Sequence, residues 1–279
     1  MLGIALALGS SLIYGVSDFL GGLKSRSLPL QSVLLVSQSG ALVLLAINVI
    51  ARGEGPPDGR YLIYGAIAGL CEAVGVAAFY RGLAVGVMSV VSPIAATAPV
   101  VPVVAAIVLG ELPSVFQGVG IFLALAGIAT ISPEPGRGGP ARDVAPSIIF
   151  GLLTALGFGG FLVAMDAASE GGVPWALLMA RSAAVAAFTA AFLLARTRLG
   201  VRSADLPVLV LIGVLIIAAD SMYAVATTED LLSVVAVLSS LYPVVTIALA
   251  RYYLRERLQP HQQIGAAASL SGAVVISAA

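Results

Sequence analysis

The sequence predicts an all-α integral membrane protein of ten transmembrane helices, built as two inverted five-helix repeats. Three observations lead to this fold class: the composition, the apolar runs and an internal repeat. Of the 279 residues, 59% are hydrophobic and only 10% are charged. A soluble domain carries about 25% charged residues, because water must wet its surface. Lipid must therefore solvate much of the surface of this chain.

Ten apolar runs are long enough to cross a bilayer as helices, which takes about 20 residues each. They cover residues 2–23, 31–51, 61–80, 87–109, 115–132, 146–168, 174–195, 206–227, 231–250 and 260–278. The runs are too long and too uniformly apolar for barrel strands, which alternate over about ten residues. The longest connection, rich in Pro and Gly, lies near mid-chain. It predicts a first repeat over 1–133, a linker over 134–145 and a second repeat over 146–279.

The two halves match at a shift of 144 to 145 residues. The matching positions are Glu111 and Glu256, Gln117 and Gln262, Gly120 and Gly265, and Gly127 and Gly272. A charge, an amide and two glycines at one spacing are more specific than shared apolar residues. Each half holds five predicted spans, an odd number, so the second half must enter the membrane from the opposite side. Such repeats are related by a two-fold axis in the membrane plane.

The sequence resembles the drug/metabolite transporter superfamily, in its EamA-type ten-helix branch. The resemblance is carried by three motifs: Ala78-Phe79-Tyr80-Arg81-Gly82-Leu83, Ser89-Val90-Val91-Ser92-Pro93, and Leu109-Gly110-Glu111-Leu112-Pro113 continuing through Gly127. It implies ten helices around a central cavity lined mainly by spans 1, 3, 4, 6, 8 and 9. It also implies export or exchange of amino acids, drugs or other small metabolites. One departure is Leu254, which replaces the glycine expected before Glu256.

The first span carries a polar stripe. Successive members of this stripe are three or four residues apart, except for one adjacent pair, so they share one helix face. The members are Ser10, Tyr14, Ser17, Asp18 and Gly21. Polar groups are costly in lipid, so this face should point into the bundle, with Tyr14 and Asp18 at a substrate cavity. The alternative for Asp18 is a position at the membrane edge, solvated by headgroups.

Two carboxylates, Glu72 and Asp220, lie well inside the third and eighth spans at near-equivalent depths in the two repeats. We hypothesise that they couple proton movement to transport or bind a cationic group of the substrate. The alternative is a structural ion pair with Arg181, the arginine deep in the seventh span. Arg181 could instead neutralise Asp166 or a carboxylate on the substrate. The further residues expected at the cavity are Tyr80, Tyr223 and Ser239.

These patterns together predict a secondary transporter that works by alternating access, as an exporter or exchanger. Its expected partners are a small-molecule substrate, membrane lipid and coupling protons, and its expected location is the plasma membrane of a prokaryote. The alternatives are a membrane-embedded enzyme acting on a lipid, and a channel. The sequence has one histidine and no metal-ligand spacing, so no catalytic residue, metal or cofactor is expected. It has no basic patch for nucleic acid.

Two further expectations concern the span ends. Glu111 and Glu256 should each cap the following turn or pair with an arginine.

The orientation of the chain in the membrane is open, because two arguments disagree. Connections after odd-numbered spans hold 11 of the 14 basic residues and those after even-numbered spans hold 2. Basic residues prefer the cytoplasmic side, which places both termini outside, whereas the resemblance implies that both are inside.

Overall fold

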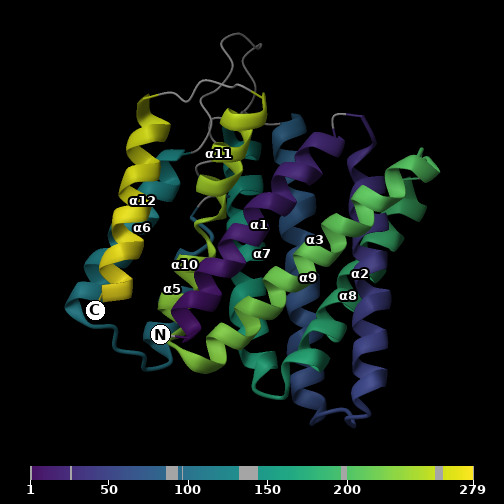
Figure 1. The fold of residues 1–279 in the computed structure, drawn as a ribbon, viewed down its shortest axis with the longest axis horizontal. Helices are drawn as coiled ribbons and strands as arrows, with labels where there is room; N and C mark the ends of the chain where they lie inside the picture. Colours follow the sequence, from purple (N-terminus) through teal and green to yellow (C-terminus); the bar gives the residue numbers. More distant parts are fainter. Residues whose placement is uncertain are drawn as a thin grey trace.

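The computed structural model describes residues 2–25, 27–85, 94–95, 97–131, 144–195, 200–254 and 260–278, and these residues form helices joined by short connections (Figure 1). The first half contains α1 (Leu2–Ser25), α2 (Leu30–Arg52), α3 (Gly59–Val85), α5 (Val100–Val108) and α6 (Val115–Ile131). The second half contains α7 (Val144–Ser169), α8 (Val173–Ala195), the 3₁₀ helix η1 (Ser203–Asp205), α9 (Leu206–Glu229), α10 (Leu232–Ser239), α11 (Tyr242–Leu254) and α12 (Pro260–Ala278).

Six described helices are long and apolar enough to cross a membrane: α1, α2, α3, α7, α8 and α9 together with η1. Three further apolar segments are shorter, within α6, across α10 and α11, and within α12. The predicted spans coincide with these helices, except for 87–109 and 231–250. Residues 86–93 and the predicted linker residues 134–143 lie outside the described part of the chain. The count of ten spans therefore stays a prediction.

The span predicted over 231–250 is two helices, because the backbone changes its hydrogen-bonding pattern after Ser239. The N–H groups of Leu241 and Val244 donate to carbonyls three residues earlier, at 3.3 and 3.0 Å, instead of four. In the first half, 144 residues earlier, Thr97 and Val100 make the same bonds at 3.0 and 2.9 Å. The same change of backbone hydrogen-bonding pattern thus occurs at the same point of both halves.

Proline explains the position of these interruptions. Pro99 and Pro243 occupy equivalent positions in the two halves, and neither has an N–H to donate to the carbonyl four residues earlier. The span predicted over 231–250 is therefore divided into α10 and α11. Interrupted helices at corresponding points of two repeats are typical of transporters, where they lie close to the substrate site.

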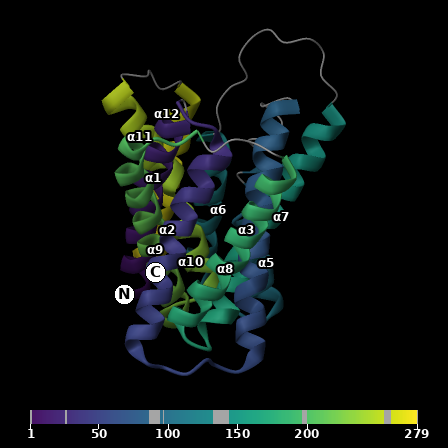
Figure 2. The same ribbon diagram turned by 90° about the vertical axis from the view of Figure 1, so that its right-hand side faces the viewer.

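Helix packing follows the repeat. α1 packs against α9 as α7 packs against α3, and α2 packs against α9 as α8 packs against α3. α2 also packs against its own counterpart α8, and α6 against α12. Figure 2 shows the two equivalent groups, α1, α9 and α11 and then α7, α3 and α5, on opposite sides of the molecule. α1 leads away from the end that holds both termini and α7 leads back towards it (Figure 1), so the halves are inverted.

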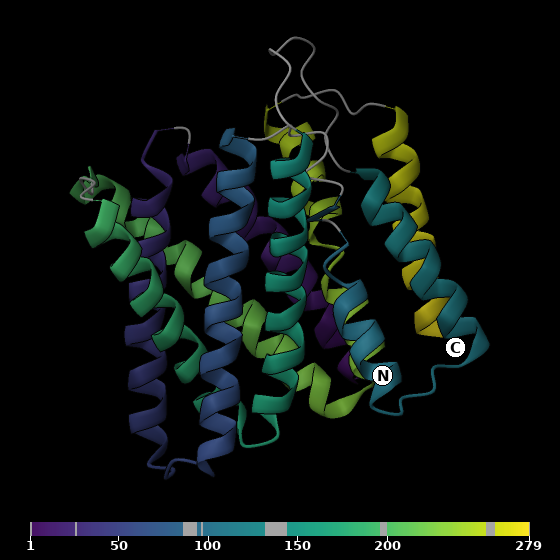
Figure 3. The same cartoon turned by 180° about the vertical axis from the view of Figure 1, so that it is seen from behind.

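Glycine permits the closest of these approaches. A Cβ atom on Gly69 of α3 would collide with the backbone carbonyl of Ala180 in α8, and one on the equivalent Gly213 of α9 would collide with the carbonyl of Ser37 in α2. Small residues let membrane helices approach this closely. At the edge of the molecule, α6 and α12 lie side by side (Figure 3), and a Cβ on Gly272 would lie 2.6 Å from the carbonyl oxygen of Gly120.

Candidate functional site

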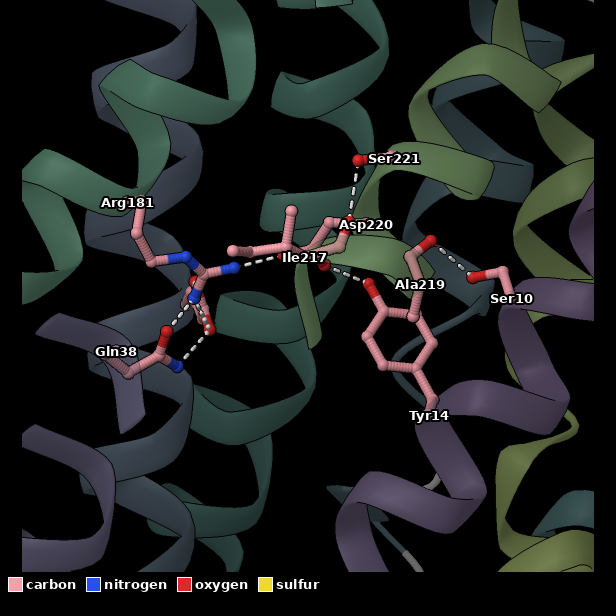
Figure 4. A network of polar contacts seen from close by, with 9 residues as sticks. Ser10, Tyr14, Gln38, Arg181, Ile217, Ala219, Asp220 and Ser221 are labelled. Atoms are coloured by element: carbon pink, nitrogen blue, oxygen red, sulfur yellow. Dashed lines mark hydrogen bonds and ion pairs between the residues drawn. The ribbon is translucent and has the colours of Figure 1, made fainter. Parts of the chain in front are cut away.

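Arg181 lies at the centre of a buried polar cluster. It follows Ala180, so the close approach of α3 to α8 brings its side chain beside α3. Its Nη1 donates to Glu72 at 3.1 Å (Oε1) and 3.4 Å (Oε2), and its Nη2 donates to Asp220 Oδ2 (Figure 4). The side chains of Arg181 and Asp220 are almost fully buried, and that of Glu72 is 15% exposed. The two carboxylates singled out in the sequence thus share one guanidinium.

Two neutral side chains complete the cluster. Gln38 of α2 accepts a hydrogen bond from Arg181 Nη1 and donates one to Glu72 Oε1 at 3.2 Å. The Tyr14 hydroxyl of α1 donates to Asp220 Oδ1. The five side chains come from α1, α2, α3, α8 and α9, and we refer to Tyr14, Gln38, Glu72, Arg181 and Asp220 as the Arg181 network.

The network lies near the middle of the membrane helices. Glu72 is at the centre of α3, and Arg181 is eight residues from the start of α8, or about 12 Å along its axis. Tyr14, Gln38 and Glu72 belong to the first half, whereas Arg181 and Asp220 belong to the second. The bonds from Tyr14 to Asp220 and from Arg181 to Glu72 and Gln38 therefore join the two halves at mid-depth.

The network contains more acid than base. Arginine stays protonated in proteins, so one guanidinium faces two carboxylates, and the network carries one net negative charge when both are ionised. A buried charge without a counter-ion is costly. A proton or a cationic group would neutralise the network. In addition, Arg181 Nε is buried with no acceptor among the described residues, which leaves one donor for a ligand or water.

Three of the other residues predicted at the cavity, Asp18, Tyr223 and Ser239, lie outside the network. Asp18 is one turn beyond Tyr14 but is exposed on the side of α1 and does not join the network. Tyr223 is fully buried and its hydroxyl donates to the Leu162 carbonyl at 2.9 Å, tying α9 to α7. Ser239, at the end of α10, is buried with its hydroxyl 3.4 Å from the Ala7 carbonyl. Tyr80 is in α3, but its side chain lies outside the described part.

Glu111 was expected to cap the turn that follows it or to pair with an arginine. Instead it caps a helix of the other half. Its carboxylate accepts hydrogen bonds from Leu232 N at 2.8 Å, Ser233 N at 3.2 Å and Ser233 Oγ at 2.9 Å, in the first turn of α10. The following turn is capped instead by Ser114 and Gln117, whose side chains each bond to the other's backbone N–H. Glu256 lies outside the described part.

Sequence reasoning missed Gln38. An uncharged amide within an apolar run carries little signal, although a polar side chain at membrane depth needs a partner. The resemblance placed the cavity on spans 1, 3, 4, 6, 8 and 9, whereas Gln38 and Arg181 lie on the second and seventh. The network therefore extends to helices outside that set.

Within the described residues, no group of three His, Cys, Asp or Glu side chains could hold a metal ion.

Comparison with known proteins agrees with this architecture. The model of the EamA-like transporter family matches residues 1–132 and again residues 145–278. The chain is similar in fold to a solved crystal structure at a TM-score of 0.79, with 16% sequence identity over 99% of this chain and 97% of that chain. A search of curated proteins found no match. One family model matches each half separately, so the resemblance seen in the sequence is confirmed. The chain belongs to the EamA-like transporter family, a family of multi-pass membrane transporters within the drug/metabolite transporter superfamily.

Proposed function

We propose that this protein is a secondary transporter that exports or exchanges a small metabolite, amino acid or drug by alternating access, with the Arg181 network as its substrate and coupling site. The observation that carries the proposal is the position of the network. An acid-rich cluster is buried at mid-depth, and its bonds connect the two inverted halves. Ionisable groups at this depth mark substrate or ion pathways in membrane proteins.

The proposed mechanism starts from the bond between α8 and α9. Rocking the packed pair α1 and α9 against the packed pair α3 and α8 would separate Arg181 from Asp220. Separation would expose a carboxylate without its partner, which is costly at this depth. A proton or a cationic amino group on Glu72 or Asp220 would lower that cost, because it replaces the lost counter-charge. The conformational change would thereby be coupled to the bound proton or substrate.

The same geometry suggests which substrates fit. An amino group would bind the carboxylates of Glu72 and Asp220, and a substrate carboxylate would bind Arg181, whose Nε has no acceptor among the described residues. Amino acids carry both groups, and amines and cationic drugs carry the first. An anion without an amino group would meet the net negative charge of the network, so we expect it to be transported poorly.

Metabolite export tests the proposal. Cells overexpressing the protein and cells lacking it should differ in a small set of exported amines or amino acids. Glu72→Gln and Asp220→Asn should each lower export of that compound at least about tenfold, the factor expected when a contact of about 1.4 kcal/mol in the transition state is lost. Export should be measured at two pH values, since coupling to protons predicts that the wild-type response to pH disappears in these variants.

The matched control is Asp58→Asn, which neutralises an exposed acid just before α3, with a side chain 66% exposed. It should export as the wild type does. Unchanged export and unchanged pH response in both network variants would contradict the proposed site. Single-channel currents in reconstituted bilayers, in place of saturable export, would contradict alternating access.

A further inference from the structure

A groove separate from the Arg181 network runs between α2, α8 and α9, in the part of the molecule nearer the termini. Its volume is about 580 Å³, within the range of about 300–1,000 Å³ that ligand pockets occupy. α2 contributes Leu44 and Arg52 to its lining, α8 contributes Leu177, and α9 contributes Val214 and Ala218. The polar residues of the lining are Asn48 and Arg52 of α2 and Ser221 of α9, and the rest of the lining is apolar.

The shape of the groove follows from the crossing of α2 and α9. The backbones touch where Gly213 meets the carbonyl of Ser37, and the helices diverge from there towards the termini. Leu44 and Val214, on either side of the opening, are 42% and 40% exposed, whereas Leu177 at the back is 4% exposed. α2, α8 and α9 all have the length of membrane spans. The groove therefore opens sideways, towards lipid acyl chains.

The length and polarity of the groove match one leaflet of a bilayer. Leu44 and Arg52 are eight residues apart, or about 12 Å along a helix, and half of the hydrocarbon core measures about 15 Å. Arg52 is the last residue of α2 and is half exposed, so it lies at headgroup level. Its Nε donates to Asn48 Oδ1 at 3.1 Å, and its Nη1 lies 3.7 Å from Glu54 Oε1. The groove thus has a mainly apolar trough with Arg52 at its outer end, and Glu54, which is outside the lining, lies beside that arginine.

We propose that this groove is a binding site for one zwitterionic phospholipid with a primary amine. An acyl chain fills the trough between α2 and α9, the phosphate binds Arg52, and the ammonium group binds Glu54. A lipid is the occupant because the opening faces the bilayer, where lipid is the solvent. A zwitterionic headgroup matches the adjacent opposite charges, whereas an anionic headgroup would meet Glu54 unfavourably. The site is independent of the transported substrate.

Native mass spectrometry of the protein in mild detergent tests the proposal. Phosphatidylethanolamine and phosphatidylglycerol with identical acyl chains serve as probes. The wild type should retain one phosphatidylethanolamine molecule, with an affinity about tenfold higher than for phosphatidylglycerol. Ala218→Phe places a ring in the trough and should lower retention about tenfold. Leu211→Phe is the matched control, because Leu211 lies on the same helix, is 46% exposed and does not line the groove.

The headgroup contacts are tested separately at the exposed end, where substitutions do not disturb packing. Arg52→Gln should lower retention of both lipids, and Glu54→Gln should abolish the preference for phosphatidylethanolamine. Arg60→Gln, the other arginine at this end, should change neither. Equal retention of the two lipids by the wild type would overturn the proposal. So would undiminished retention in Arg52→Gln, or in a folded Ala218→Phe protein.

Discussion

Arg181 is the only described cation in a cluster with two carboxylates, so the three charges depend on one another. A buried ion pair contributes little net stability, because the desolvation of its charges offsets their attraction. Removing one partner is costly, since it leaves a buried charge unpaired. The Arg181 network should therefore tolerate loss of all its charges better than loss of the arginine alone.

This asymmetry gives the first prediction. Arg181→Gln should lower the stability of the protein by about 3–5 kcal/mol, because Glu72 and Asp220 lose their shared counter-ion. The triple variant that also carries Glu72→Gln and Asp220→Asn should regain most of this loss. Thermal unfolding of the detergent-solubilised proteins measures both effects. Equal destabilisation of the single and triple variants would show that the charges do not interact.

At this scale the sequence identified the ionisable members of the network and offered their ion pair with Arg181 as one alternative, but it did not predict the hydrogen bonds that Gln38 and Tyr14 make with them. Glu72, Asp220 and Arg181 stand out because a charge in an apolar run is rare. Tyr14 was found through its polar stripe. Tyr223 shares a helix with Asp220, yet it packs against α7 because helix periodicity gives a direction around one axis and does not say which neighbour lies there. The position of Ser239 depends in the same way on where α10 ends.

The helices of the two halves approach one another at equivalent glycines, Gly69 and Gly213. Ala180 and Ser37, the residues they touch, directly precede Arg181 and Gln38 in sequence. These crossings therefore place the two side chains that join α8 and α2 to the Arg181 network. Neither crossing was predicted, because a glycine in an apolar run does not show which helix it meets.

The second prediction concerns these crossings. Gly69→Leu and Gly213→Leu should each destabilise the protein by about 1–3 kcal/mol or more, because the added side chain forces backbones apart. Gly118→Leu is the control, since a Cβ there meets no atom within 4 Å. Thermal unfolding in detergent compares the three variants. A Gly69 variant as stable as the control would contradict the packing of α3 on α8.

Glu111 links the halves at the beginning of α10, an element that is short and entirely buried. The carboxylate satisfies backbone N–H groups of a helix first turn, where negative charge is also favoured by the helix dipole. The interruption at Pro243 leaves α10 with only eight residues. A helix this short depends on its tertiary contacts, so this cap should matter more than a cap on a long span.

The third prediction follows from this cap. Glu111→Ala should destabilise the protein by about 1.5–3 kcal/mol, the range for hydrogen bonds to a charged group. Glu111→Gln keeps an acceptor and should lose less than half of that amount. The thermal midpoints of both variants provide the measurement. If both substitutions cost the same, the charge and the acceptor at the start of α10 would not be the cause.

At the scale of the whole molecule, the repeat in the sequence anticipated the arrangement of the halves. Spaced polar residues gave a shift of 145 residues, and the helix pairs exchange under a shift of 144 to 145 residues. An odd number of crossings in each half was enough to predict inversion. Pro243 marks the position of the interruption within the ninth predicted span, but the sequence does not show how far the helix opens, because neighbouring helices determine that.

The fourth prediction is the orientation. The ends of α1 and α3 that hold Lys24 and Arg81 lie away from the termini (Figure 1), and the connections after odd-numbered predicted spans hold 11 of the 14 basic residues. Basic residues favour the cytoplasm, so the termini should lie outside. In a Cys71→Ala background, an impermeant maleimide should label Gly55→Cys in intact cells and Ser27→Cys only after lysis. The reverse pattern would show that the family orientation holds.

The most direct test of the two packed groups rocking around the Arg181 network is a pair of distances measured by pulsed electron spin resonance. One spin-label pair occupies Ser27 and Arg81, at the end away from the termini, and the other occupies Glu170 and Glu229, at the opposite end. Each pair joins the group of α1 and α9 to the group of α3 and α7. On addition of the exported compound, one distance should shorten as the other lengthens. Two unchanged distances, or changes in the same direction, in a protein that still transports would contradict the account.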